Sequence, residues 1–230
     1  MAVQLLVEEV KPRLRGWLHL CAVPVTLVAG VVLVALSPTA TTRAGSAAFI
    51  GSALLLFTVS ALYHRGRWSP HMWGLLRRLD HANIFALIAG SYTAFALVFL
   101  HGRSRWLLLG LVWGVAAVGV VFRVLWIGAP RWLYVPIYVA LGWTAAAFFG
   151  PVTASARSYV GLGISALALV FVGGVLYTLG GLVYGLKKPN PSPTWFGFHE
   201  VFHSLTLAAF FAQYVGLSLA TYTLVVPSPS

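Results

Sequence analysis

Acidic side chains are almost absent from this 230-residue sequence, which has four of them against fifteen lysines and arginines. The four are Glu8, Glu9, Asp80 and Glu200. Charged residues of both signs make up only 8% of the chain, whereas hydrophobic residues make up 60%. A soluble domain of this length needs far more polar surface than that, so the composition excludes one and indicates a membrane protein.

Cysteine and lysine are also scarce, and each scarcity excludes a class of site. Cys21 is the single cysteine, which excludes an intramolecular disulfide and a metal site built from thiolates. The three lysines, Lys11, Lys187 and Lys188, lie outside the long apolar stretches. The chain therefore cannot hold retinal through a buried Schiff base, because that bond needs a lysine inside the membrane.

Long apolar stretches dominate the sequence. A transmembrane helix needs roughly 20 mainly apolar residues, and seven stretches reach that length. They do not alternate apolar with polar residues as membrane strands do, so we predict one all-α domain, a bundle of seven transmembrane helices. The first stretch is longer than a usual signal-peptide core, so we expect it to be retained. The predicted spans are 17–37, 46–64, 80–100, 105–126, 131–150, 158–186 and 199–226.

The basic residues predict how the bundle is oriented. With a cytoplasmic amino terminus, four of the fifteen lie outside, namely Arg43, Arg103, Arg105 and Arg157, and the other eleven lie inside. Since cytoplasmic loops carry the excess of basic residues, we predict the amino terminus in the cytoplasm and the carboxyl terminus outside. The net charge of +11 lies between the spans rather than on one exposed face. We therefore expect membrane lipids as partners, and no nucleic acid.

Two Ser-Pro pairs lie in the longest polar connections on the predicted cytoplasmic side. They are Ser69-Pro70 and Ser192-Pro193. A serine cap followed by proline in the first turn is typical of a helix start. We therefore expect the third and seventh helices to begin with cytoplasmic turns before they enter the bilayer.

The predicted topology brings His64, Asp80, His199 and His203 to the cytoplasmic ends of three spans. His199 and His203 are four residues apart, so they share one helical face and can grip one ion together. Three imidazoles plus a water make a tetrahedral zinc site with one open position. Asp80 is positioned to hold that water, and Ser60, one turn from His64, to supply a hydroxyl nearby.

Simpler interpretations stand beside this one. Asp80 can instead pair with Arg77 or Arg78 at the interface, and Ser60 can return its hydroxyl to its own backbone. Isolated histidines near helix ends are usually caps or interfacial residues, and we assign that role to four of them. These four are His19, His71, His81 and His101.

Five short segments carry a resemblance to a known family. They are Ser60 to His64 (S-x-x-x-H), Leu79-Asp80-His81, His199 to His203 (H-E-x-x-H), Pro12 to His19, and Gly90 to Thr93. Together they resemble the hemolysin III family, the bacterial branch of the progestin and adipoQ receptors, from about residue 10 onward. The resemblance implies seven helices with a cytoplasmic amino terminus, and a place in the bacterial plasma membrane.

The resemblance also implies a site and a chemistry. It implies zinc bound by His64, His199 and His203, with Asp80 and Ser60 beside the metal-bound water. Related receptors and alkaline ceramidases imply hydrolysis of a lipid amide, in which Asp80 moves the water proton. Whether this chain turns over a substrate, and which one, stays open.

Two alternatives remain open at this point. His199-Glu200-x-x-His203 is also the signature of zinc metalloproteases, in which the glutamate is the general base. We favour Glu200 as a neighbour of the ligands, because His64 already offers a third one. In the second alternative, zinc only holds helices together in a membrane sensor without catalytic activity. The open coordination position favours catalysis over that role.

Overall fold

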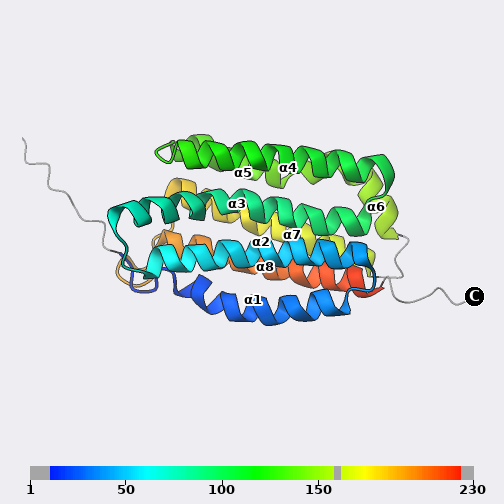
Figure 1. The fold of residues 1–230 in the computed structure, drawn as a ribbon, viewed down its shortest axis with the longest axis horizontal. Coiled ribbons are helices and arrows are strands. Elements are labelled where there is room, and N and C mark those ends of the chain that lie inside the picture. The colour runs from blue at the N-terminus through cyan, green and yellow to red at the C-terminus, as the bar shows by residue number, and fades with distance from the viewer. Residues whose placement is uncertain (1–10, 158–161, 224–230) are drawn as a thin grey trace, which may run out of the picture.

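The computed structural model describes residues 11–157 and 162–223, and in those ranges it is helical without strands. The helices run side by side along the long axis of the molecule (Figure 1). Helix α7 packs along α8, α2 along both α1 and α3, and α3 along α4. The helices are α1 (Trp17–Leu36), α2 (Ala40–Arg65), α3 (Pro70–Phe99), α4 (Gly102–Leu125), α5 (Arg131–Gly142), α6 (Phe149–Arg157), α7 (Gly163–Leu186) and α8 (Phe198–Thr223), with the 3-10 helix η1 at Thr144–Phe148.

The predicted bundle of membrane-spanning helices is confirmed. Six helices, α1, α2, α3, α4, α7 and α8, are long and apolar enough to cross a bilayer, and a bent pair around α5 and α6 brings the number to seven if it counts as one span. Residues 158–161 and 224–226, which the sequence assigns to the sixth and seventh spans, lie outside the described residues.

The fifth span differs from the continuous helix predicted over 131–150. Helix α5 ends at Gly142, and the chain tightens into η1 before α6 continues in a new direction. Tyr92 of α3 stabilises this break, because its hydroxyl donates to the carbonyl of Gly142 at 2.7 Å and accepts from the amide of Ala145 at 2.9 Å. Trp143 is fixed as well, since its indole donates to the Thr178 hydroxyl at 2.9 Å. The Tyr92 hydroxyl of α3 therefore replaces part of the regular helical bonding, and α7 holds the Trp143 side chain.

One of the two predicted helix starts is confirmed and the other is wrong. Helix α3 begins at Pro70 with Ser69 as its cap, whose hydroxyl accepts from the amide of Met72 at 3.3 Å. Ser192 instead forms a tight turn with Phe196, and α8 begins at Phe198. The carboxylate of Glu200, three residues after Gly197, accepts from the Gly197 amide at 2.9 Å. That acid supplies the cap that was expected from serine.

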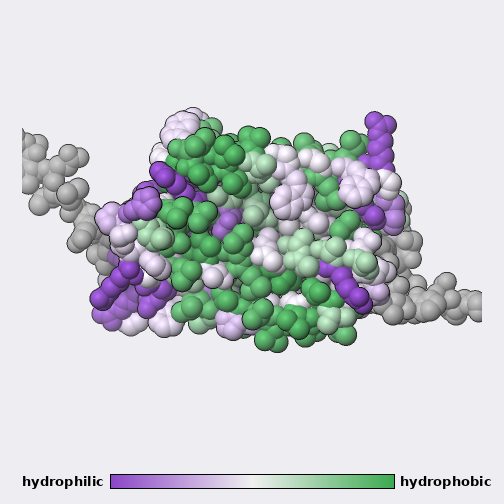
Figure 2. Space-filling view, viewed as in Figure 1, coloured by the Kyte–Doolittle hydropathy of each residue, from purple (hydrophilic) through white to green (hydrophobic). Residues whose placement is uncertain are grey.

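The molecule has an apolar belt, as a membrane-embedded protein requires. Apolar side chains cover the middle of the visible face, and hydrophilic ones gather toward its two ends (Figure 2). Val28 of α1 and Val118 of α4 are 67% and 70% exposed, whereas much of α2 and α3 is buried. The outer helices thus face lipid, and the inner ones hold the polar residues described below.

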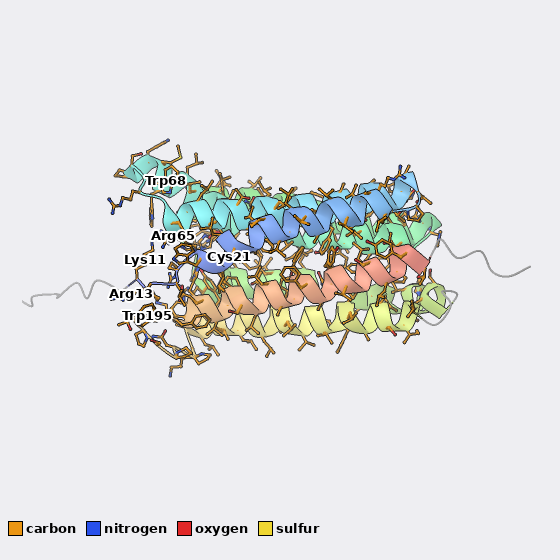
Figure 3. All side chains as sticks on the ribbon, turned by 90° about the horizontal axis from the view of Figure 1, so that it is seen from below. Lys11, Arg13, Cys21, Arg65, Trp68 and Trp195 are labelled. Carbon is orange, nitrogen blue, oxygen red and sulfur yellow. The ribbon has the colours of Figure 1, made fainter. Side chains whose placement is uncertain are left out.

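The segment before α1 crosses the end of the bundle where α2 ends and α8 begins. Lys11, Arg13, Arg65, Trp68 and Trp195 all lie at this end (Figure 3). The amide of Arg13 donates to the carbonyl of Thr194 at 3.0 Å, and its guanidinium lies over the Trp195 ring at 4.6 Å. Three of the basic residues that predicted the cytoplasmic side, Lys11, Arg13 and Arg65, therefore lie together at one end of the bundle, and the orientation itself stays a prediction.

Candidate metal centre

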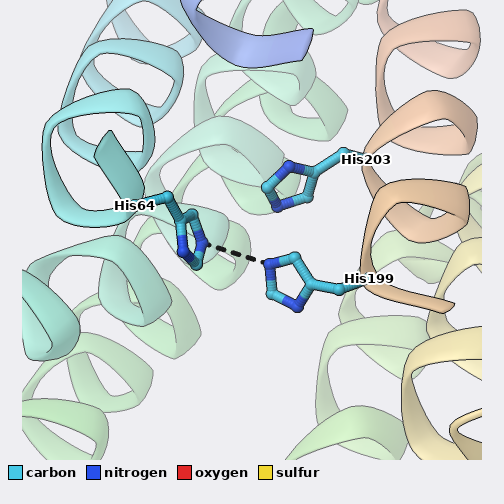
Figure 4. Close-up of side chains that lie close together, drawn as sticks. All are labelled: His64, His199 and His203. Carbon is cyan, nitrogen blue, oxygen red and sulfur yellow. Dashed lines mark hydrogen bonds between the residues drawn. The ribbon is translucent and has the colours of Figure 1, made fainter. Parts of the chain in front are cut away.

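Three histidines from two helices converge at this end of the bundle. His64 comes from the last turn of α2, and His199 and His203 come from the first two turns of α8 (Figure 4). One ligand atom from each lies within 4.8 Å of the others, and the Nε2 atoms of His64 and His199 are 3.1 Å apart. His64 is 7%, His199 9% and His203 2% exposed. The structure thus brings together the three residues expected to bind a metal.

The amino-terminal segment fixes the backbone beside His64. Lys11 donates through Nζ to the carbonyl oxygen of His64 at 2.5 Å. Gly16 has a φ of +82°, and a Cβ built there would lie 2.7 Å from the Cβ of His64. Glycine is needed at this position because other residues rarely adopt a positive φ and because a side chain there would collide with His64. Burial lowers the pKa of the Lys11 ammonium, and the charges of Arg15 and Arg65 lower it further.

The three histidines fit zinc by donor type and approximate spacing. At a Zn–N distance of about 2.0–2.1 Å, two tetrahedral ligands are about 3.3 Å apart. The 3.1 Å between His64 and His199 is close to this value. Nitrogens within 4.8 Å require only a small inward movement of a ring to share one ion. Three buried neutral imidazoles are a donor set that suits zinc, and they leave room for a fourth ligand.

Asp80 and Ser60 lie beside the histidines, as the sequence predicts. The Oδ2 atom of Asp80 is 3.8 Å from Nε2 of His64, too far for a direct hydrogen bond and close enough to share a bound group. Within the described ranges Asp80 forms no ion pair with Arg77 or Arg78. Ser60 is fully buried, and its hydroxyl forms no hydrogen bond to its own backbone and lies beside the Asp80 carboxyl. Both side chains line the cavity described below.

Glu200 is engaged in structural contacts. Its Oε1 accepts from the guanidinium of Arg15, and its Oε2 accepts from the amide of Gly197 at 2.9 Å. The carboxyl is 1% exposed. A metalloprotease base needs an oxygen that can take a proton from water beside the metal. The geometry instead supports a role in holding the amino-terminal segment against the start of α8.

His19 is a member of this layer that the sequence assigned to an interfacial or capping role. It is 2% exposed, and its ring stacks on His203 with centroids 3.8 Å apart and planes 13° apart. Neither ring nitrogen has a hydrogen-bond partner in the part of the chain that the structure describes. The N-terminal position of His19, in the first turn of α1, gave no sign of this packing, which only the contact between α1 and α8 creates.

His81, which follows Asp80 on α3, has both ring nitrogens bonded to the protein. Its Nδ1 is 2.7 Å from the carbonyl oxygen of Arg77, and its Nε2 is 3.1 Å from the hydroxyl of Tyr184. The Tyr184 hydroxyl in turn accepts from the hydroxyl of Tyr134 at 3.3 Å. His81 is thus a structural residue inside the bundle, rather than the interfacial one expected.

A cavity opens beneath the histidines. It has a volume of about 130 Å³ and lies among α2, α3, α5, α7 and α8. His199 and His203 line one part of it together with Asp80, and most of the remaining wall is apolar. The candidate metal centre therefore faces a space suited to an apolar molecule.

Residues 7–214 match the family described as "Haemolysin-III related". This chain belongs to that family. Haemolysin-III relatives include the "Hemolysin-3 homolog" of Bacillus subtilis (strain 168), 33% identical over 148 residues that cover 64% of this chain and 66% of the relative. The "Hemolysin-3" of Bacillus cereus is 31% identical over 137 residues, 60% of this chain and 59% of the relative.

The family assignment confirms the resemblance carried by the sequence segments. The matched part of this chain spans less than two thirds of the length of either relative. Bacterial haemolysin-III relatives and the apolar helices together indicate an integral protein of the bacterial plasma membrane.

Proposed function

We propose that this protein is a zinc-dependent hydrolase that cleaves the amide bond of a membrane lipid. The observation that carries the proposal is the position of His199, His203 and Asp80 on the wall of a largely apolar cavity inside a membrane protein, with His64 beside them. His64, His199 and His203 would hold the metal. Zinc, when bound, supplies a Lewis acid that polarises a carbonyl and lowers the pKa of a water to about 7.

Asp80 is the proposed general base and acid. It accepts a proton as a water oxygen bonds to the amide carbon, and it returns a proton to the nitrogen as the C–N bond breaks. One amide and one water thereby become a carboxylic acid and an amine. The 3.8 Å separation from His64 supports this role, because it keeps the carboxylate beside the ligand cluster without using up its oxygen in a hydrogen bond to that ring.

Ser60 is the proposed donor to the carbonyl oxygen. Its buried hydroxyl is not bonded to its own backbone, so it can donate to an oxygen that gains negative charge during the attack. The apolar wall then holds the acyl chain. Leu56, Ile84 and Leu87 line this wall and exclude water from the chain.

Two features argue for catalysis over the alternatives. Three protein ligands leave a coordination position open, whereas structural zinc normally has four. The metalloprotease alternative requires Glu200 as base, but both of its oxygens accept hydrogen bonds from Arg15 and Gly197.

The test uses purified protein in detergent or lipid nanodiscs with a panel of ceramides and other lipid amides. We expect release of fatty acid, and we expect Asp80→Asn to lower kcat by a factor of about 10²–10⁴ while the protein keeps its zinc. Ser60→Ala should lower kcat by a factor of about 10²–10³. Wild-type protein that carries zinc and hydrolyses no lipid amide would refute the proposal. Equal turnover by wild type and Asp80→Asn would refute the role of Asp80.

A further inference from the structure

The cavity extends well beyond the histidines, and three helices contribute polar side chains to its distant part. These are Ser91 of α3, Tyr177 of α7 and Gln213 of α8. Gln213 follows His203 by ten residues and Ser91 follows Asp80 by eleven, so each lies about 15 Å farther along its helix. The polar group formed by Ser91, Tyr177 and Gln213 is called the distal site below.

Tyr177 lies at a corresponding depth on α7. Tyr184 marks the level of the histidines, since its ring is 5.0 Å from that of Phe202, and Tyr177 precedes it by seven residues, or about 10 Å of helix. A Cβ built on Gly173, one turn from Tyr177, would lie 2.7 Å from Cγ of Gln213. Helices α7 and α8 therefore approach each other closely at the distal site.

The distal polar atoms lack hydrogen-bond partners. The hydroxyl of Tyr177, the side-chain carbonyl of Gln213 and the hydroxyl of Ser91 are all buried, and none has a partner in residues 11–157 or 162–223. Such groups are rare in native proteins, because each loses its bonds to water and gains nothing in return. Because these atoms lie far inside an apolar bundle, no bulk water is near to replace the missing hydrogen bonds.

Three polar residues on the same wall, Thr178, Thr206 and Tyr92, are satisfied by the protein. Thr178 donates to the carbonyl of Gly174 at 2.8 Å and accepts from Trp143. Thr206 donates to the carbonyl of Phe202 at 3.0 Å, and Tyr92 bonds to Gly142 and Ala145. Unpaired polar atoms on the cavity wall therefore gather in two places among the described residues: at the histidine end, where His19 and Ser60 lie beside the candidate metal ligands, and at the distal site.

The unpaired atoms specify the chemistry of a partner. The Gln213 carbonyl only accepts, whereas the hydroxyls of Tyr177 and Ser91 can donate or accept. A neutral hydroxyl, which both donates and accepts, complements this set. A carboxylate or phosphate does not, because it cannot donate to Gln213 and the three residues provide no cation.

We propose that the cavity binds a single-chain lipid whose hydrocarbon chain carries a hydroxyl group near its middle, and that the distal site binds this hydroxyl. The polar head of the same lipid lies at the histidines. The placement of the head rests on the proposed function, whereas the recognition of the hydroxyl rests on the distal site alone.

The experiment measures binding, so it does not depend on turnover. Purified wild-type protein is titrated with stearic acid and with hydroxystearic acids that carry the hydroxyl at successive positions, in competition with a fluorescent fatty acid. We expect mid-chain isomers to bind about five- to tenfold more tightly than stearic acid, the gain of one well-made buried hydrogen bond. Isomers with the hydroxyl near either end should show no gain.

Three variants and one control locate the effect. Gln213→Leu, Tyr177→Phe and Ser91→Ala should each bring the ratio of the affinity for mid-chain hydroxystearic acids to the affinity for stearic acid close to one. The affinity for stearic acid itself should stay within about twofold of the wild-type value. Thr206→Val is the matched control, since it also removes a hydroxyl from the cavity wall, but one already bonded to its own helix. It should keep the full preference.

Three outcomes would overturn the proposal. They are equal affinity of wild type for stearic acid and every hydroxystearic acid, no binding of any of them, and a preference that survives the distal variants or disappears with Thr206→Val. The comparison in wild type decides the matter even if a variant fails to fold. Failure of the hydrolase proposal has a different signature, which is mid-chain preference without turnover of any lipid amide.

Discussion

His81 and His199 lie on the wall of one cavity, yet their rings have different surroundings. Both nitrogens of His81 are within 3.1 Å of protein oxygens, on Arg77 and Tyr184. His199 directs Nε2 at the Nε2 of His64, 3.1 Å away. Hydrogen bonds to protein oxygens hold the ring of His81 in a fixed orientation. Ring nitrogens that face each other, as those of His64 and His199 do, compete for one proton, and a shared cation satisfies them all. The contrast separates structural histidines from ligands better than distance from the cavity does.

The largest expected effect is the loss of metal from His203→Ala. Removing one of the three proposed ligands should lower the bound zinc from the expected one ion per chain to background. This is a far greater loss than the roughly 10–100-fold change in affinity typical of supporting residues. Metal analysis of protein recovered from gel filtration checks this. A variant that is monodisperse but carries no zinc would show that the protein folds without the metal, as expected for a zinc site with an open coordination position. Full zinc retention would contradict the assignment of His203 as a ligand.

Arg15→Ala should produce the largest loss of stability. It leaves the buried carboxylate of Glu200 without its guanidinium partner, which should cost about 3 kcal/mol, the lower end of the range for breaking a buried pair. Thermal unfolding in detergent provides the measurement. Glu200→Gln is the milder matched change, because the amide oxygen can still accept from Gly197 and the partly exposed Arg15 can reach water. Equal stability of Arg15→Ala and wild type would show that the segment before α1 does not hold the site.

His81→Gln should leave the zinc content unchanged. Its expected effect is a stability loss of about 1 kcal/mol, since the shorter amide cannot keep both bonds of the imidazole, to Arg77 and to Tyr184. Zinc content and thermal unfolding are measured on the same samples as for His203→Ala. A variant that folds but has lost its metal would place His81 among the ligands and break the distinction between the two histidines.

His19→Phe should have the smallest effect. Phenylalanine keeps a flat ring against His203 and removes two ring nitrogens that have no partner among the described residues. We expect unchanged zinc and a thermal stability equal to or slightly above that of wild type, by up to about 1 kcal/mol. His19→Ala, which leaves a gap beside His203, is the contrasting variant and should be less stable. Loss of zinc from His19→Phe would make His19 a fourth ligand and favour a structural metal.

The sequence predicts that the candidate metal ligands converge at one end of the bundle, and the reason is physical. His199 and His203 are four apart on one helix, and the alternation of spans returns His64 and Asp80 to the same side. These are properties of helical geometry and topology, which can be read from spacing. The position of Glu200 next to the candidate ligands could also be predicted from the sequence. Its contact with Arg15 could not, because the two residues are 185 positions apart in the chain.

Other features could not be predicted from spacing, because they depend on contacts between helices. The stacking of His19 on His203 requires α1 to lie against α8. The break after Gly142 depends on the Tyr92 hydroxyl of another helix, and no proline or charge marks it at residues 142–148. The distal site combines Ser91, Tyr177 and Gln213 from three helices, and no spacing along the chain links these residues.

The central claim is that His64, His199 and His203 bind one zinc ion. X-ray absorption spectroscopy of protein purified without added chelator or histidine tag tests it most directly. The account predicts about one zinc per chain with nitrogen or oxygen ligands at about 2.0–2.1 Å and a signal from imidazole rings, absent in the His199→Ala, His203→Ala double variant. Wild-type protein without stoichiometric metal, or a zinc signal that survives in the double variant, would contradict it.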